Sequence, residues 1–287
     1  MADDVVIESE RDLEAVFAPL ARTQRMVFFT GLPGVGKSLF IRELALAAHS
    51  AGRTVHLLQW DVARPAFVSP AINACYPERD GVTHAMIRKA VGRWARGAVL
   101  RWDREHDAAH ILIGEVPIIG NRLLDLAQVQ ADDAEPLLAG RDALFVTPVP
   151  SIAVRAVIEN ARSRTFTNPA HPRETGDAPP NVLQMIWQEV HAIAVTIGAA
   201  MPAIDGRTPF DPQAYAAVYR QLLRHRRALT LWVNAPLEPR KSVYDLEVAT
   251  SELVATADEA NAIVAQLERE YSAHEIEQDV SNWFEKV

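Results

Sequence analysis

The residues best suited to chemistry stand together near the amino terminus. Residues 31–38 read Gly-Leu-Pro-Gly-Val-Gly-Lys-Ser, a complete match to the pattern G-x-x-x-x-G-K-[ST]. Glycines let backbone N–H groups turn inward around an anion, Lys37 adds a mobile positive charge, and the Ser38 hydroxyl is a ligand for Mg²⁺. A glycine-rich turn with a surface lysine is the alternative, but it does not explain why lysine and serine follow the last glycine directly. We therefore expect this run to hold the phosphates of a nucleotide.

The segments on either side of the run agree with that interpretation. An apolar run at 26–30 predicts a strand, and the apolar spacing after residue 38 predicts a helix. A helix that begins near Gly36 would point the positive end of its dipole at bound phosphates. The residues expected to contact the nucleotide are Gly31, Gly34, Val35, Gly36, Lys37, Ser38 and Leu39.

Two carboxylates are expected near the same place. Asp61 ends a strand predicted at 54–60, and Glu115 follows a strand predicted at 109–113. Asp61 would accept the proton of an acceptor hydroxyl, with Arg64 holding an anionic group on the acceptor. Glu115 would hold Mg²⁺ through water or position an attacking water. The alternatives are a turn cap for Asp61 and a surface acid for Glu115.

A third group of candidates is arginine-rich. The segment 155–180 contains Arg155, Arg162, Arg164 and Arg173. Arg155 and Arg162 are seven residues apart, so they share one face of a helix predicted at 150–163. An arginine from a lid-like segment would stabilise the charge of a transferred phosphoryl group, and the Pro- and Gly-rich stretch 168–180 would act as a lid that excludes water. The alternative is a solvated face on which Glu159 pairs with Arg155 or Arg162.

Several other polar groups are expected to have structural or solvated roles only. Asn121 and Arg122, in a helix predicted at 121–130, belong here, as do His106 and His110, which are expected to be solvated loop histidines rather than metal ligands. A predicted helix at 83–105 has a basic face that we expect to be solvated, with a phosphate or polyanion site as the alternative. That face consists of Lys89, Arg93, Arg96 and Arg104.

Alternating strands and helices predict an α/β fold of three layers around a parallel sheet. Five strands are predicted, at 25–30, 54–60, 109–113, 143–147 and 228–233. We expect one domain over 1–287, with a helical insertion at 62–107 between the second and third strands and a C-terminal helical tail at 246–287. Because ligands bind beyond the carboxyl ends of parallel strands, the loop, Asp61 and Glu115 should share one edge of the sheet.

Composition limits the classes of function. The formal net charge is −8, which argues against a general nucleic-acid partner. We find no apolar run long enough to cross a membrane, the acidic start lacks the features of a signal peptide, and a single cysteine fits a reducing cytoplasm. The apolar stripe of the tail is expected to dock on the domain, and pairing with a second copy into a homo-oligomer is the alternative.

With these residues in view, the chain resembles P-loop NTPases of the nucleotide- and small-molecule-kinase group. The resemblance implies that the insertion binds the acceptor and that Asn234–Arg240 contacts the base of ATP. Two differences from the motifs of related families limit what this resemblance implies. Gly114-Glu115-Val116-Pro117 stands where adenylate-kinase-like enzymes have Asp-Gly-Phe-Pro-Arg, which disfavours a nucleoside monophosphate acceptor. Val233-Asn234-Ala235-Pro236 is not the Asn-Lys-x-Asp of GTPases, which disfavours a GTP switch.

The sequence therefore predicts an ATP- and Mg²⁺-dependent phosphotransferase that acts on a small-molecule acceptor. The residues expected to be catalytic are Lys37, Asp61, Glu115, Arg155 and Arg162, with Ser38 and Glu115 serving the metal. A regulatory P-loop ATPase, whose hydrolysis controls a protein partner, is the alternative. A module that keeps its nucleotide as a structural element is a third possibility.

Overall fold

The central sheet of the computed structural model is entirely parallel. The structure describes residues 3–79, 82–167, 171, 180–203, 208–237 and 245–286. Within these ranges the sheet has seven strands in the order β1-β6-β5-β2-β4-β3-β7. The strands are β1 (Asp3–Ile7), β2 (Met26–Thr30), β3 (Thr54–Gln59), β4 (His110–Val116), β5 (Ala143–Pro150), β6 (Ala228–Val233) and β7 (Thr250–Glu252).

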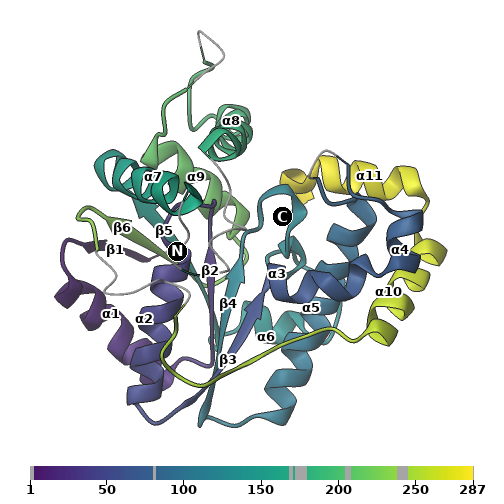
Figure 1. The fold of residues 1–287 in the computed structure, drawn as a ribbon, viewed down its shortest axis with the longest axis horizontal. Helices are drawn as coiled ribbons and strands as arrows, with labels where there is room; N and C mark the ends of the chain where they lie inside the picture. Colours follow the sequence, from purple (N-terminus) through teal and green to yellow (C-terminus); the bar gives the residue numbers. More distant parts are fainter. Residues whose placement is uncertain are drawn as a thin grey trace.

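Helices cover both faces of this sheet (Figure 1). Val27 and Phe29 of β2 pack with α1 and α2 on one face, while Met26 and Phe28 pack with α5 and α9 on the other. This alternation follows from the two-residue period of a strand. The helices are α1 (Glu10–Thr23), α2 (Lys37–Ser50), α3 (Trp60–Ala63), α4 (Pro70–Cys75), α5 (Ala85–Glu105), α6 (Glu135–Ala139), α7 (Ile152–Thr167), α8 (Pro180–Thr196), α9 (Pro212–Leu222), α10 (Ala257–Glu270) and α11 (Ala273–Ser281).

The expected α/β class and parallel sheet are confirmed, but the expected number of strands is wrong. The two additional strands, β1 and β7, lie at opposite edges of the sheet. β1 has a short apolar run behind two aspartates, and β7 is the polar triplet Thr-Ser-Glu. Neither has a clear apolar pattern because an edge strand can be stabilised mainly by backbone hydrogen bonds to its one neighbour.

Two predicted helices are also wrong. The segment 121–130 is not a helix, because residues with positive φ interrupt it and only short 3₁₀ turns form, at Ile119–Asn121 and Leu124–Leu126. In the tail, the helix predicted from residue 246 begins only at Ala257. There Thr256 and Glu259 form a reciprocal capping box, which satisfies backbone N–H groups at the helix start.

The insertion and the tail lie side by side at one end of the molecule (Figure 1). The insertion at 62–107 contains a 3₁₀ turn at Arg64–Val68, then α4 and α5, and the tail helices α10 and α11 pack against α5. Trp94 and Trp102 of α5 are buried. None of the described helices has the length and apolar character needed to cross a membrane.

The cations on the basic face of α5 pair with acids of the tail and of the segment after β4. The pairs are Lys89 with Asp279, Arg93 with Glu270, Arg96 with Asp132 and Glu135, and Arg104 with Asp133. The prediction of a solvated face is wrong at Lys89 and Arg96, whose side chains are covered by acids from distant parts of the chain. It is right at Arg104, which is exposed with its partner.

Candidate functional site

The glycine run forms the turn between β2 and α2, where the motif predicts it. β2 ends at Thr30, and α2 begins at Lys37 with Gly36 as its N-cap residue. Gly31, Gly34 and Gly36 have φ values of 130°, 79° and 93°. Residues with a Cβ rarely adopt these conformations, so the turn depends on glycine. The result is a loop that opens onto the N-terminus of a helix, which is an arrangement suited to binding an anion.

Lys37 lies folded into this loop. Its side chain is 5% exposed, and Nζ donates hydrogen bonds of 2.9 Å to the carbonyl oxygens of Gly31 and Leu32. Nζ also lies 3.4 Å from Oε1 of Glu115. Burial lowers the pKa of the Lys37 ammonium, and the neighbouring Glu115 carboxylate opposes that shift. The lysine is thus a buried cation whose partners all belong to the strand ends around the loop.

Glu115 reaches the loop because β4 is the direct neighbour of β2. In the register of the two strands it stands opposite Phe29, one residue before the end of β2. The strand predicted at 109–113 is longer than expected, so Glu115 lies inside β4 rather than after it. Ser38 is the second residue of α2 and is partly exposed. A hydroxyl and a carboxylate are hard oxygen donors of the kind that Mg²⁺ prefers.

Tyr215, which was not among the residues expected from the sequence, contacts the backbone of the loop. The hydroxyl oxygen of Tyr215, in α9, accepts a 3.3 Å hydrogen bond from the backbone N–H of Leu32. A Cβ added to Gly31 would stand only 2.3 Å from that oxygen. Burial raises the pKa of the Tyr215 phenol, so it stays protonated. No local pattern marks this role, because Tyr215 is 183 residues from Leu32 in the chain.

The two candidate arginines have different surroundings. Arg155 is 3% exposed, donates from Nε to Glu159 at 2.8 Å, and its guanidinium carbon lies 4.6 Å from the centre of the Phe210 ring. Glu159 therefore pairs with Arg155, as the alternative prediction stated, although the pair is not on a solvated face. Arg162 lies at the loop, since its Nε is 4.0 Å from the position that a Cβ on Gly34 would occupy.

Asp61 stands on the opposite side of Lys37, toward the insertion. β3 ends at Gln59, so Asp61 is the second residue of the short helix α3 rather than the last residue of a strand. Its exposed carboxylate acts on two cations, because its charge raises the pKa of both Lys37 and Arg122 against the larger effect of burial. Asp61 thus lies between the phosphate-binding loop and Arg122, and its position fits contact with an acceptor.

Arg122, which was expected to be structural, belongs to a strained turn directly after β4. Four residues of this turn have positive φ values: Ile118, Gly120, Asn121 and Leu123. The carbonyl of Gly120 accepts a 2.9 Å hydrogen bond from Arg88 of α5. A β-branched residue with φ of 66°, as at Ile118, is unusual, and such strain persists only where the surroundings hold it.

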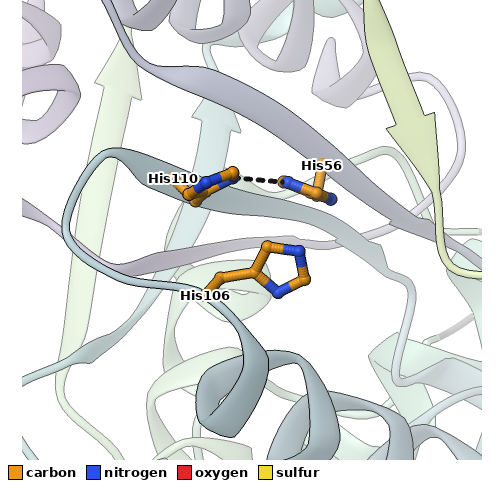
Figure 2. A group of neighbouring side chains, drawn as sticks. All are labelled: His56, His106 and His110. Carbon is orange, nitrogen blue, oxygen red and sulfur yellow. Dashed lines mark hydrogen bonds between the residues drawn. The ribbon is translucent and has the colours of Figure 1, made fainter.

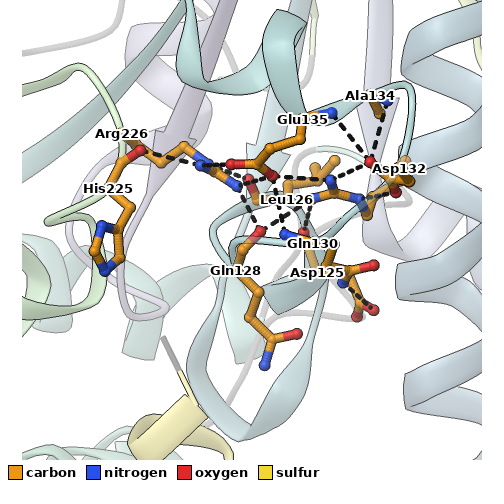
Figure 3. Close-up of polar contacts among 10 residues, drawn as sticks. Asp125, Leu126, Gln128, Gln130, Asp132, Ala134, Glu135, His225 and Arg226 are labelled. Atoms are coloured by element: carbon orange, nitrogen blue, oxygen red, sulfur yellow. Dashed lines mark hydrogen bonds and ion pairs between the residues drawn. The ribbon is translucent and has the colours of Figure 1, made fainter.

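Buried ion pairs fix the segment that follows this turn (Figure 3). Arg226 donates from Nε to the carbonyl of Leu126 at 2.8 Å and pairs with Glu135. Arg96 of α5 donates to the carbonyls of Asp125 and Gln128 and pairs with the same glutamate. Charged hydrogen bonds to backbone carbonyls give an irregular segment fixed partners, as a helix or strand ladder would. The turn that carries Arg122 is therefore held from both ends.

A pocket of about 240 Å³ opens within the insertion. Arg64, Tyr76, Glu78 and His84 are among the residues that line it. Arg64 pairs with Glu78 at 3.1 Å, and its positive charge also acts on Arg122. Arg64 of the pocket and Asp61 therefore both lie near Arg122. A larger cavity of about 380 Å³ near β7 includes no residue of the loop.

Some predicted contacts fall outside the described residues. These are Arg173, residues 238–240 of the segment expected to contact the base, and most of the lid-like stretch 168–180. The structure places Lys37, Glu115, Arg162 and Asp61 around one loop. Arg155 pairs with Glu159, and its charge acts on Tyr215, which contacts the loop.

Comparison with known proteins adds little to this geometry. No family model matches the sequence, and no curated protein matches it. Among solved structures, the assembled ATPase EscN of the type III secretion system of enteropathogenic E. coli aligns with 12% identity over 83% of this chain, with a TM-score of 0.15. The chain spans 44% of that protein. A likeness this weak supports no argument about fold or activity, so the loop sequence and the site geometry must carry the interpretation.

Proposed function

We propose that the protein is an ATP- and Mg²⁺-dependent phosphotransferase that moves the γ-phosphoryl group to a small-molecule acceptor. The observation that supports this most strongly is the arrangement around Lys37. Lys37, in a complete phosphate-binding sequence, lies 3.4 Å from Glu115, and the charge of Asp61, at the start of the insertion, also acts on the lysine. A donor site and an acceptor site that meet at one cation are what direct phosphoryl transfer requires.

The donor side would work mainly by stabilising the negative charge of the ATP phosphates. The loop N–H groups and Lys37 bind the phosphates, and Lys37 exchanges its present carbonyl partners for phosphate oxygens. Ser38 and Glu115 would hold Mg²⁺, which would supply positive charge to offset that of the phosphates. Arg162, beside Gly34, stabilises the charge on the equatorial oxygens during transfer.

The acceptor side would supply a hydroxyl group. Asp61 takes the hydroxyl proton as the acceptor oxygen forms its bond to the γ-phosphorus, and the bond from that phosphorus to the β–γ bridging oxygen breaks, which releases ADP. Arg64 and Arg122 favour an acceptor that carries an anionic group. The pocket of about 240 Å³ limits that acceptor to a small molecule.

The test is ADP release from ATP and Mg²⁺, with and without a panel of hydroxyl-bearing acceptors, half of them anionic. We expect an acceptor to increase ADP release and to recover the phosphate in product. Lys37→Ala should abolish nucleotide binding without unfolding the protein, whereas Arg104→Ala, which changes an exposed ion pair, should behave as wild type. Wild-type protein that binds no nucleotide with Mg²⁺ would overturn the proposal.

The two arginines provide an internal check on this assignment. Arg162→Met should reduce turnover by about 100-fold with little change in thermal stability, because it removes charge from the transition state. Arg155→Met should do the reverse, since it removes a buried guanidinium that pairs with Glu159 and lies over the Phe210 ring. Kinetics and thermal melts of both variants measure the difference. Equal effects of the two substitutions on turnover would remove Arg162 from the mechanism.

One observation favours a second candidate, a regulatory ATPase. Glu115 lies beside Lys37, where a carboxylate could orient an attacking water instead of an acceptor hydroxyl. In that case ADP release would proceed without any acceptor and would rise when a protein partner is added. Asp61→Asn separates the two functions, because it should stop acceptor phosphorylation but leave hydrolysis intact.

A further inference from the structure

Three histidines from separate elements meet at the amino-terminal end of the sheet. His56 lies in β3, His110 is the first residue of β4, and His106 is the C-cap residue of α5. Glu115 lies five residues further along β4, so this cluster is about 17 Å from the phosphate-binding edge, at ~3.3 Å per residue. The cluster is therefore a separate place on the molecule from the site described above.

The ring nitrogens of the three side chains converge (Figure 2). One nitrogen from each ring lies within 4.8 Å of the other two, and Nε2 of His56 is 2.9 Å from Nδ1 of His110. Nitrogens that bind one tetrahedral Zn²⁺ at 2.0–2.1 Å stand about 3.4 Å apart. Small side-chain rotations are enough to bring the observed arrangement to that spacing.

Neighbouring groups orient two of the rings as they would orient metal ligands. Nδ1 of His106 donates to the carbonyl oxygen of Trp102 at 2.8 Å, so the lone pair of the neutral ring is on Nε2. Nε2 of His110 faces Oδ1 of Asp107 at 3.9 Å, so its other nitrogen is directed to the cluster. A carbonyl or carboxylate on the far nitrogen is the usual support of a metal-binding histidine.

Two arginines lie beside the cluster and bind its backbone. Arg25 donates to the carbonyl oxygen of His106 and pairs with Asp103. Arg53 donates to the carbonyl oxygens of His110, Ala21, Gln24 and Ala108. These oxygen partners offset part of the positive charge of the two guanidinium groups.

We propose that His56, His106 and His110 bind one divalent transition-metal ion, with Zn²⁺ as the expected occupant. Three imidazoles suit Zn²⁺, Co²⁺, Ni²⁺ or Cu²⁺ and do not suit Mg²⁺ or Ca²⁺, which prefer oxygen. His106 and His110 are partly exposed, so an ion can enter from solvent, which also supplies the fourth ligand. The ion takes the place of the hydrogen bond between His56 and His110, the proton of that bond moves to the other nitrogen of the same ring, and the ion joins β3, β4 and α5.

A purely structural role for the cluster is the alternative. His106 stacks on Trp102 with an interplanar angle of 17°, so the rings contribute to packing whether or not they bind an ion. Packing alone predicts no metal affinity, and a metal site predicts one equivalent. The two roles therefore separate by direct titration.

The experiment is a Zn²⁺ and Co²⁺ titration of chelator-treated full-length protein in excess Mg²⁺, which keeps oxygen sites occupied. A competing chromophoric chelator measures Zn²⁺ affinity, and the absorption bands of Co²⁺ report a four-coordinate site. Because Cys75 is an exposed thiol, the titration is repeated with Cys75→Ser. We expect one equivalent to bind in both proteins. No binding, or binding that depends on Cys75, would overturn the proposal.

Single substitutions locate the ligands. His106→Gln and His110→Gln should each weaken binding by at least ~10–100-fold, the loss seen even for groups that only orient a ligand. His274→Gln, on the exposed surface of α11, should bind as wild type. Unchanged affinity in either cluster variant would overturn the proposal. If a variant fails to fold, protection of the three wild-type histidines from diethylpyrocarbonate by Zn²⁺ decides, and no protection would refute the site.

Discussion

Gly31, the first residue of the glycine loop, lies close to the hydroxyl group of Tyr215. We expect Gly31→Ala to lower the free energy of unfolding by about 2–4 kcal/mol, because it combines a strained backbone with a steric clash. The φ of Gly31 is 130°, and an added Cβ would lie 2.3 Å from the tyrosine oxygen. Chemical denaturation measures the loss, and nucleotide binding should weaken with it.

A double-mutant cycle tests whether the tyrosine is the cause. Tyr215→Phe removes the oxygen that the new methyl group would meet, at the cost of the hydrogen bond from Leu32. Gly31→Ala should therefore cost less in the Tyr215→Phe protein than in wild type. Strictly additive losses would show that backbone strain alone explains the effect of Gly31→Ala.

Asp125 should make the stability of the fold decrease as the pH rises. Burial raises the pKa of this carboxyl above its ordinary value of 3.8, against the opposing effects of Lys89, Gln130 and Arg96. The unfolded carboxyl therefore loses its proton first, and the stability that protonated Asp125 contributes is lost as pH rises from about 3.8 through the raised pKa. Asp125→Asn, which stays neutral, should have a higher Tm than wild type at pH 7.

The same comparison near pH 4 is the control for Asp125→Asn. At that pH more of the wild-type Asp125 is protonated in the fold than at pH 7, because its pKa is raised, so the difference in Tm between the two proteins should shrink. The substitution keeps the shape that Gly92 of α5 accommodates, where a Cβ would lie 1.9 Å from the carboxylate. A Tm for Asp125→Asn at or below that of wild type at pH 7 would contradict the assignment.

Residues of the site differ in how far the sequence could reveal them. Lys37 and Ser38 follow from the spacing of the motif, and Glu115 follows from a strand that neighbours β2. Tyr215 and Arg122 could not be identified, because their roles depend on contacts between distant segments and on a strained turn. His56 was overlooked as a partner of His106 for the same reason, since it lies 50 residues earlier in a different element.

Among the elements, α10 depends on a single glutamate for two contacts. Glu259 completes the capping box with Thr256 and also pairs with Arg101 at 2.6 Å. Glu259→Ala should lower the free energy of unfolding by about 1–2 kcal/mol, mostly through the cap, whereas Arg101→Ala should cost at most about 0.5 kcal/mol because its pair is exposed. Urea denaturation of each variant provides the measurement.

Glu259→Gln is the matched variant for separating the two contacts. Glutamine can still accept the backbone hydrogen bond of the capping box, but it carries no charge for Arg101. Its loss should therefore resemble that of Arg101→Ala. A loss as large as that of Glu259→Ala would mean that the ion pair, not the cap, stabilises the start of α10.

Sequence patterns predicted strands correctly where burial of an apolar run is what stabilises the strand. Apolar runs identified the five inner strands because those strands are buried on both faces. They failed at β7, which depends on the free edge of β3, and at 121–130, where positive φ values replace a helix. In both places the conformation is set by tertiary contacts that local propensity does not contain.

At the scale of the whole molecule, the tail completes the hydrophobic core beside α5. Buried side chains of the tail include Val264, Leu267, Ile276, Val280 and Trp283. Removal of residues 257–287 would expose the apolar side of α5 and leave Lys89, Arg93 and Arg101 without their acidic partners. We expect this truncated protein to aggregate or to lose cooperative unfolding, as size-exclusion chromatography and thermal melts would show.

Removal of residues 1–8 is the contrasting truncation. It deletes only β1, an edge strand whose main contact is β6, although it also removes the carbonyl of Ile7 that accepts from Asn234. The protein should stay folded with a lower Tm and should keep the phosphate-binding loop intact. If the tail truncation instead left one cooperative melt like that of wild type, the sheet would fold without the tail, and the expectation of a single domain over 1–287 would be wrong.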